Sequence, residues 1–118
     1  DSGSEVSMLA EFTDAIRKHK WIVVTGWVPH WKFARWPLKF LEDPKNVFGG
    51  KQHINTIVRQ GLKQDMPEAY ALLDNFKWTP EQMSQLLLWN RTDHGSYPYG
   101  NALRFIRSNR ALIESWLP

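Results

Sequence analysis

The sequence contains no cysteine, and this absence removes several kinds of chemistry. Without thiols the chain forms no disulfide, has no thiolate-ligated metal and offers no cysteine nucleophile. None of the four histidines is spaced as H-x-x-x-H or H-E-x-x-H, so no zinc site is predicted. These histidines are His19, His30, His53 and His94. We therefore expect neither a metal nor a cofactor.

Long apolar runs and blocks of like charge are also lacking. No run reaches the roughly eighteen apolar residues of a membrane-spanning helix. Fifteen basic and twelve acidic residues give a net charge of +3, spread along the chain. The one basic strip between aromatics, from Trp31 to Trp36, is short, so we expect no nucleic-acid partner.

Motifs of the common enzyme classes are missing as well. The chain has no G-x-S-x-G elbow, no P-loop and no G-x-G-x-x-G sequence. The adjacent carboxylates Glu42 and Asp43 are expected to point apart, which makes them poor partners for acid and base catalysis. We therefore assign no catalytic residue and do not expect an enzyme.

Apolar and aromatic residues, in contrast, are abundant. Among the 118 residues, 42% are hydrophobic and 14% aromatic, which is enough for a packed core. Four of the seven tryptophans lie at or beside apolar positions of expected helices or strands, which favours a place in that core. These are Trp21, Trp78, Trp89 and Trp116.

Apolar residues recur at helical spacing in four segments. These are residues 4–18, a segment opened by Pro67, a segment opened by Thr79-Pro80, and residues 98–116. Ser4 can cap the first helix, and Gln82 can complete a capping box with Thr79. We predict four helices.

Three further segments have the character of strands. Residues 21–25 are continuously apolar and rich in β-branched side chains, which is typical of a strand covered on both faces. Residues 38–42 and 54–59 are the other candidates. The predicted fold class is therefore α/β, and because three strands make a thin sheet, we expect one part of a larger α/β protein.

The run Trp27-Val28-Pro29-His30-Trp31 is the main candidate for a binding site. Trp27 follows Gly26 at the end of the first expected strand, and ligands of open α/β sheets gather at such ends. An indole face attracts a desolvated cation and suits a quaternary ammonium group, whereas a histidine can donate to a carboxylate. A small zwitterion is therefore the first ligand to test. A backbone-bonded loop histidine is the alternative for His30.

Two other functions fit the same residues. Trp27 and Trp31 can stack on a sugar or another small solute such as an amino acid, and His30 can serve a hydrolase. The chain begins with Asp and lacks a basic and apolar leader, so we expect a processed chain or an excised fragment.

The motifs G-W-V-P-H-W at 26–31, L-K-F-L-E-D-P at 38–44, P-E-A-Y at 67–70 and L-D-N-F at 73–76 occur together in this order. With them, the chain resembles the substrate-binding protein of glycine betaine (osmoprotectant) ABC transporters, in its C-terminal part. The resemblance covers almost the whole chain. It implies a type II periplasmic-binding-protein fold, in which two α/β lobes close over the ligand.

The resemblance also implies site residues and partners. Trp27 matches a tryptophan of the cage around the trimethylammonium group, and His30 matches the histidine proposed to hold the carboxylate. The implied function is capture of glycine betaine or a related quaternary-ammonium osmolyte, at the periplasmic or extracellular face of the membrane, for delivery to the ABC transporter permease. Which betaine is preferred stays open.

Proteins of that family are more than twice as long as this chain. We therefore expect residues 1–118 to be a C-terminal fragment of the binding domain, without the first lobe and its cage aromatics. Residues 90–100 depart from the short connection that the family suggests, so no role is assigned to them. A homo-oligomer or an exchange of elements between copies would cover sheet edges left open in the fragment.

Overall fold

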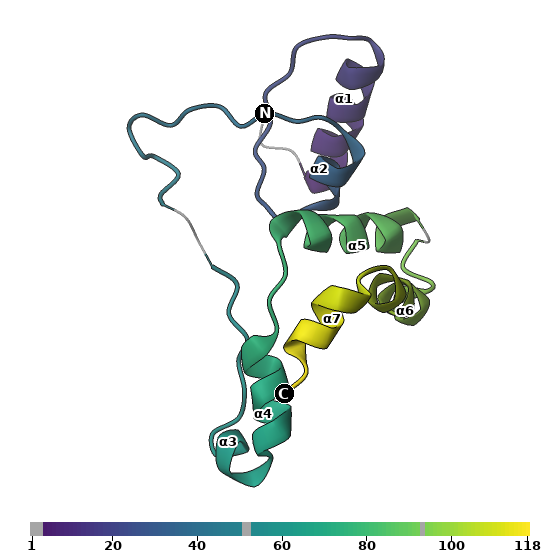
Figure 1. The fold of residues 1–118 in the computed structure, drawn as a ribbon. Helices are drawn as coiled ribbons and strands as arrows, with labels where there is room; N and C mark the ends of the chain where they lie inside the picture. The colour runs from purple at the N-terminus through teal and green to yellow at the C-terminus, as the bar shows by residue number, and fades with distance from the viewer. Residues whose placement is uncertain (1–3, 51–52, 93) are drawn as a thin grey trace.

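The computed structural model describes residues 4–50, 53–92 and 94–118, and the regular elements in these ranges are helices (Figure 1). The helices are α1 (Glu5–Arg17), α2 (Trp31–Arg35), α3 (Leu62–Asp65), α4 (Pro67–Asn75), α5 (Pro80–Thr92), α6 (Pro98–Ser108) and α7 (Arg110–Trp116). Figure 1 shows α5 in the middle, with α1 and α2 on one side of it and α3 and α4 at the opposite end.

The first predicted helix and its Ser4 cap are confirmed. The Ser4 hydroxyl accepts the N–H of Ser7 at 3.3 Å, which caps α1. Arg17 and Lys18 at the other end both pair with Asp14. These are exposed pairs and contribute little, so the helix is held mainly by its buried residues Phe12 and Ala15.

Helix α5 begins with the predicted capping box. The backbone N–H of Thr79 donates to Oε1 of Gln82 at 2.8 Å, and the N–H of Gln82 donates to Oγ1 of Thr79 at 3.3 Å. The short helix α2 packs on α5, and α6 packs on α5 as well. The central helix therefore joins the N-terminal elements to the C-terminal ones.

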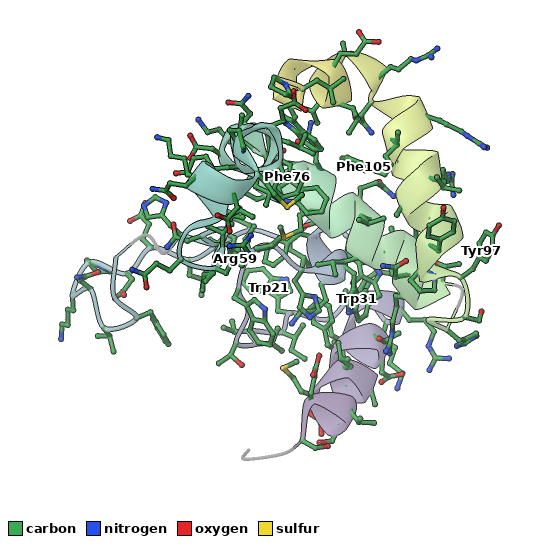
Figure 2. All side chains as sticks on the ribbon, turned by 90° about the horizontal axis from the view of Figure 1, so that it is seen from below. Trp21, Trp31, Arg59, Phe76, Tyr97 and Phe105 are labelled. Atoms are coloured by element: carbon green, nitrogen blue, oxygen red, sulfur yellow. The ribbon has the colours of Figure 1, made fainter. Side chains whose placement is uncertain are left out.

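An aromatic cluster at the C-terminal end connects α4, α6 and α7. Phe76 contacts Trp116 and Trp78, with ring centroids 4.6 and 5.3 Å apart, and Trp78 contacts Phe105 at 5.4 Å. Figure 2 labels Phe76, which directly follows α4, and Phe105 in α6. The indole N–H of Trp116 donates to the carbonyl of Lys77 at 3.0 Å, so the predicted burial of Trp116 is confirmed.

The single helix predicted over residues 98–116 is wrong. Asn109 leaves helical geometry at φ −127° and ψ 42°, and α6 and α7 lie on either side of it. Its side-chain amide donates to the carbonyl of Phe105 at 2.9 Å, which competes with the helical ladder. The break lets α7 pack on α4. The short helices α2 and α3 were not predicted.

The three predicted strands are not formed in the part of the chain that the structure describes. Residues 21–25, 38–42 and 54–59 are without regular structure, because no neighbouring backbone pairs with them. Several of their apolar side chains remain in solvent, with exposed fractions of 102% for Trp21, 77% for Val23 and 91% for Ile57. The predicted core position of Trp21 is therefore wrong, and an α/β sheet is not seen in these residues.

The molecule is extended for its length. Its radius of gyration is 18.1 Å, compared with the roughly 13 to 14 Å expected for a compact domain of this size. Residues 37–50 swing away from the helices in Figure 1, and residues 53–60 lead to α3. Among the described residues, few apolar side chains are buried: Phe12, Ala15, Phe105 and Trp116. No helix in this part of the chain has the length and apolar content needed to cross a membrane.

Candidate functional site

Residues 26–30 form a turn between the extended segment 21–25 and helix α2. The hydroxyl of Thr25 lies 4.0 Å from the sulfur of Met8, which sets the segment against α1. The Val28–Pro29 peptide bond is cis, and His30 then begins α2 as its N-cap. At this turn Trp27 lies beside His30, with ring centroids 5.2 Å apart.

His30 is buried and bonded to two elements. Its backbone N–H donates to the hydroxyl of Ser84 in α5 at 3.1 Å, and its ring Nδ1 accepts the N–H of Lys32 at 3.2 Å. The other nitrogen, Nε2, lies 3.7 Å from Oε1 of Glu5, which is too long for a good hydrogen bond. His30, for which a backbone-bonded loop histidine was the alternative to ligand binding, is thus a helix cap whose Nε2 is not committed to a strong partner.

The electrostatic surroundings keep this imidazole neutral. Burial lowers the pKa of His30 below its ordinary value of 6.5, and the charge of Lys32 lowers it further. Arg91 acts in the same direction, whereas Glu5 opposes them. Because Nδ1 accepts a hydrogen bond, the single proton of the neutral ring resides on Nε2. His30 can therefore donate one hydrogen bond from Nε2.

Trp27 presents an open aromatic surface next to this donor. Its side chain is 56% exposed, and its ring meets that of His30 edge to face, with centroids 5.2 Å apart and planes at 89°. The ammonium of Lys32 lies over the indole, 5.5 Å from its centroid. One face of the ring is therefore occupied by a cation, and much of the remainder is accessible.

Trp31 faces a different part of the surface. It packs against His30 and Trp36, with centroids 5.3 and 5.8 Å apart, and the guanidinium of Arg91 lies over its ring at 5.0 Å. Figure 2 shows Trp31 next to α5. An open pocket is lined here by Trp31, Leu87, Asn90, Arg91, His94 and Gly95.

Sequence reasoning missed three residues that contact the candidate site: Lys32, Ser84 and Arg91. Ser84 and Arg91 lie more than fifty positions from Trp27, and no local motif marks them. Lys32 was treated as part of a short basic strip, although it is 1% exposed. No group of three metal-ligating side chains occurs in the described ranges.

Comparison with known proteins identifies the family. Residues 2–108 match OpuAC, the substrate binding domain of the ABC-type glycine betaine transport system. The chain belongs to this family. It is 44% identical over 115 residues to a curated relative, the glycine betaine/carnitine transport binding protein GbuC of Listeria monocytogenes. The resemblance inferred from the sequence motifs is therefore confirmed.

Two solved structures resemble the chain over 98% of its length. Lactococcal OpuAC, in a closed-liganded conformation complexed with glycine betaine, matches with a TM-score of 0.73 and 40% identity. The glycine betaine, L-proline-binding protein ProX of Borrelia burgdorferi matches with a TM-score of 0.72 and 36% identity. The chain thus has the arrangement of a portion of these substrate-binding proteins.

The match covers only part of each relative. The chain spans 38% of the Listeria protein, 45% of the lactococcal chain and 43% of the Borrelia chain. Trp27, His30 and the extended segments 21–25, 38–42 and 54–59 all lie within residues 2–108, the part matched to the family.

Proposed function

We propose that this chain forms part of the ligand-binding component of an ABC importer, which captures glycine betaine or a related quaternary-ammonium osmolyte and delivers it to the permease. The observation that carries the proposal is the pairing of Trp27 and His30, whose rings are 5.2 Å apart. They offer an accessible aromatic surface and a neutral N–H donor within the span of one small zwitterion. Membership of the family supports the same ligand class.

Trp27 binds the trimethylammonium group in this proposal. A quaternary ammonium has no N–H to donate, so it is recognised by aromatic faces and not by ordinary acceptors. Trp27 is 56% exposed, so part of its indole surface is accessible to the ligand. Other aromatic walls of the cage are contributed by residues outside this chain.

His30 binds the carboxylate in this proposal. Its Nε2–H faces Glu5 at 3.7 Å, and Glu5 is an exposed residue. A ligand carboxylate that approaches to about 2.9 Å replaces this long contact with a hydrogen bond. The lowered pKa of His30 means that the ring acts as a neutral donor and not as an imidazolium ion.

We also propose that residues 1–118 are a C-terminal portion of a two-lobed α/β protein. The exposed apolar segments 21–25, 38–42 and 54–59 have the composition of strands but lack partners in the described residues. Pairing with strands outside this chain would satisfy their backbone groups and bury their side chains. In a substrate-binding role the intact protein acts at the periplasmic or extracellular face of the membrane.

The alternatives predict different behaviour. Stacking of a sugar would use the same face of Trp27 and would not need His30 Nε2. A hydrolase would need a nucleophile near His30, but the hydroxyl of Ser84 contacts the backbone N–H of His30. No catalytic step is assigned.

Calorimetric titration of the natural gene product tests the proposed function. We expect glycine betaine to bind and simple sugars to give no heat. Trp27→Ala should weaken betaine binding by about thirtyfold or more, and Trp27→Phe by less, because a desolvated cation over an indole is worth about 2 kcal/mol. Tyr99→Ala, which changes an exposed aromatic on α6, is the control and should not alter affinity. Absence of betaine binding by the wild-type protein would refute the proposal.

A further inference from the structure

Lys32 is an unusual lysine because it is almost completely buried. Its exposed fraction is 1%, and it is the largest fully buried side chain among the described residues. It lies in the first turn of α2, the helix that packs on α5. Charged side chains are rarely buried to this extent without a partner of opposite charge.

No carboxylate neutralises this ammonium in the part of the chain that the structure describes. The ion pairs found there are Arg17 and Lys18 with Asp14, His30 with Glu5, and Arg59 with Asp65. The Nζ of Lys32 instead lies 3.5 Å from the carbonyl of Thr25 and 5.5 Å from the ring centroid of Trp27. Its positive charge is therefore poorly compensated and poorly screened by water.

The candidate site consequently lies in a positive local field. Lys32 and Arg91 are the cations that act on His30, and Glu5, which is exposed, is the anion. A ligand on the exposed surface of Trp27 encounters the same Lys32 charge, because an indole ring does not screen a charge as water does.

We propose that Lys32 is a specificity-determining residue of the site, whose buried positive charge selects net-neutral zwitterions such as glycine betaine over monocations such as choline. The proposal rests on the proposed function, because it requires a quaternary ammonium to bind at Trp27. Lys32 does not touch the ligand. It acts through the electric field of its ammonium, which lies 5.5 Å from the ring centroid of Trp27.

The separation of the charges supports a measurable effect. Because Nζ lies 5.5 Å from the ring centroid, a ligand cation within about 6 Å of that centroid lies at most roughly 11 Å from Nζ. At this distance and an effective dielectric constant of about 20, repulsion weakens binding of a monocation about tenfold. For a zwitterion, attraction of the carboxylate offsets much of the repulsion. The charge therefore discriminates between ligands that share the same trimethylammonium group.

The experiment measures dissociation constants for glycine betaine and choline with the natural gene product, choline by competition if it binds weakly. The variants are Lys32→Met and Lys32→Gln, which remove the charge, and Lys32→Arg, which keeps it. Lys20→Met removes an exposed lysine and is the matched control. We expect the ratio of the choline constant to the betaine constant to fall about tenfold in the two neutral variants. It should stay within about twofold of wild type in the Arg and control variants.

The ratio isolates the charge from other effects of the substitution. If loss of Lys32 lets the indole of Trp27 move, both ligands lose affinity alike and the ratio stays constant. Betaine binding with an unchanged ratio in both neutral variants would overturn this inference alone. An equal change in Lys20→Met would also overturn it. A wild-type protein that binds neither ligand would overturn the proposed function, and this inference with it.

Discussion

The imidazole of His30 meets the indole of Trp27 edge to face, with ring centroids 5.2 Å apart. His30 is held by hydrogen bonds to the Ser84 hydroxyl of α5 and to the backbone N–H of Lys32 in α2. The edge-to-face contact therefore connects the exposed tryptophan to a buried, hydrogen-bonded group. This arrangement favours a preorganised site, because a ring fixed before binding loses less conformational entropy when the ligand arrives.

Substitution of His30 by asparagine should separate its two roles. Asparagine is a good N-cap and can accept the N–H of Lys32, whereas it lacks the Nε2–H donor. We expect His30→Asn to change the free energy of unfolding by less than about 0.5 kcal/mol but to weaken betaine binding about tenfold. Choline affinity should change less, because choline has no carboxylate. Calorimetry with both ligands measures the difference.

His30→Ala removes the cap and the donor together, so it should lose both stability and betaine affinity. If His30→Asn binds betaine as well as wild type does, His30 is a structural cap and does not bind the carboxylate.

Stability should fall as the pH is lowered from about 7 to 5. The pKa of His30 in the folded protein lies below its ordinary value of 6.5, so the unfolded chain takes up the proton more readily. The contribution of neutral His30 to the free energy of unfolding is fully present above the pKa of His30 in the unfolded chain. It is lost as the pH falls through the pKa of His30 in the folded protein. Urea unfolding at several pH values measures this slope.

The comparison for the pH series is His30→Asn, which should have a flatter profile over the same range. Asp14 and Glu81 also have lowered pKa values, but carboxylates titrate near pH 4 and lower and so fall outside this window. An identical slope in His30→Asn would show that another group causes the dependence.

Removal of the buried charge of Lys32 should stabilise the fold. Burial of an ammonium without a carboxylate partner carries a desolvation cost that Met avoids, while Met fills a similar volume. We expect Lys32→Met to increase the free energy of unfolding by about 1 kcal/mol. The exposed Lys20→Met should change it by less than about 0.5 kcal/mol. A clear destabilisation by Lys32→Met would mean that the contacts with Thr25 and Trp27 outweigh the cost of burial.

The capping box of α5 offers a test of the central helix. Thr79→Ala removes the acceptor for the N–H of Gln82 and should lower the free energy of unfolding by about 1 kcal/mol. Thr92→Ala at the other end of α5 is a matched control, because its hydroxyl only bonds back to the carbonyl of Leu88. Equal effects of the two substitutions would indicate that the box does not stabilise α5.

The 118-residue chain in isolation should self-associate. Its extended segments expose apolar side chains and unpaired backbone groups, which are a template for pairing with another copy. Light scattering coupled to gel filtration should give a mass above that of the 13.9 kDa monomer. Val23→Lys should reduce the association, whereas Lys39→Arg, a substitution at an exposed position, should not. A monomeric wild-type chain that binds betaine with the affinity of the intact protein would contradict both this expectation and the proposed incompleteness of the chain.

Local signals in the sequence predicted the helices best. The Ser4 cap and the Thr79 box depend on residues three positions apart, so they are readable without knowledge of the fold. The break at Asn109 was missed because helical spacing continues across it. What ends the helix is a side-chain bond to Phe105 together with packing of α7 on α4.

The strand predictions rested on local composition and alternation, which cannot specify whether a partner strand is present. Residues 21–25 have the β-branched and apolar character of a buried strand, yet Trp21 and Val23 are exposed. A strand exists only as part of a ladder of hydrogen bonds, and the described residues supply no second edge. The same reason explains why Trp21 is not in the core.

By itself, the sequence determined the family, the chemistry of the Trp27 to Trp31 run and the ends of the capped helices, because each depends on residues close together along the chain. The tertiary structure alone decided the state of His30, which is set first by its burial and then by the charges of Lys32, Glu5 and Arg91. It also decided that Lys32 is buried, with its ammonium over the ring of Trp27. Burial and electrostatic fields arise from groups that only the fold brings together, so no local pattern could predict them.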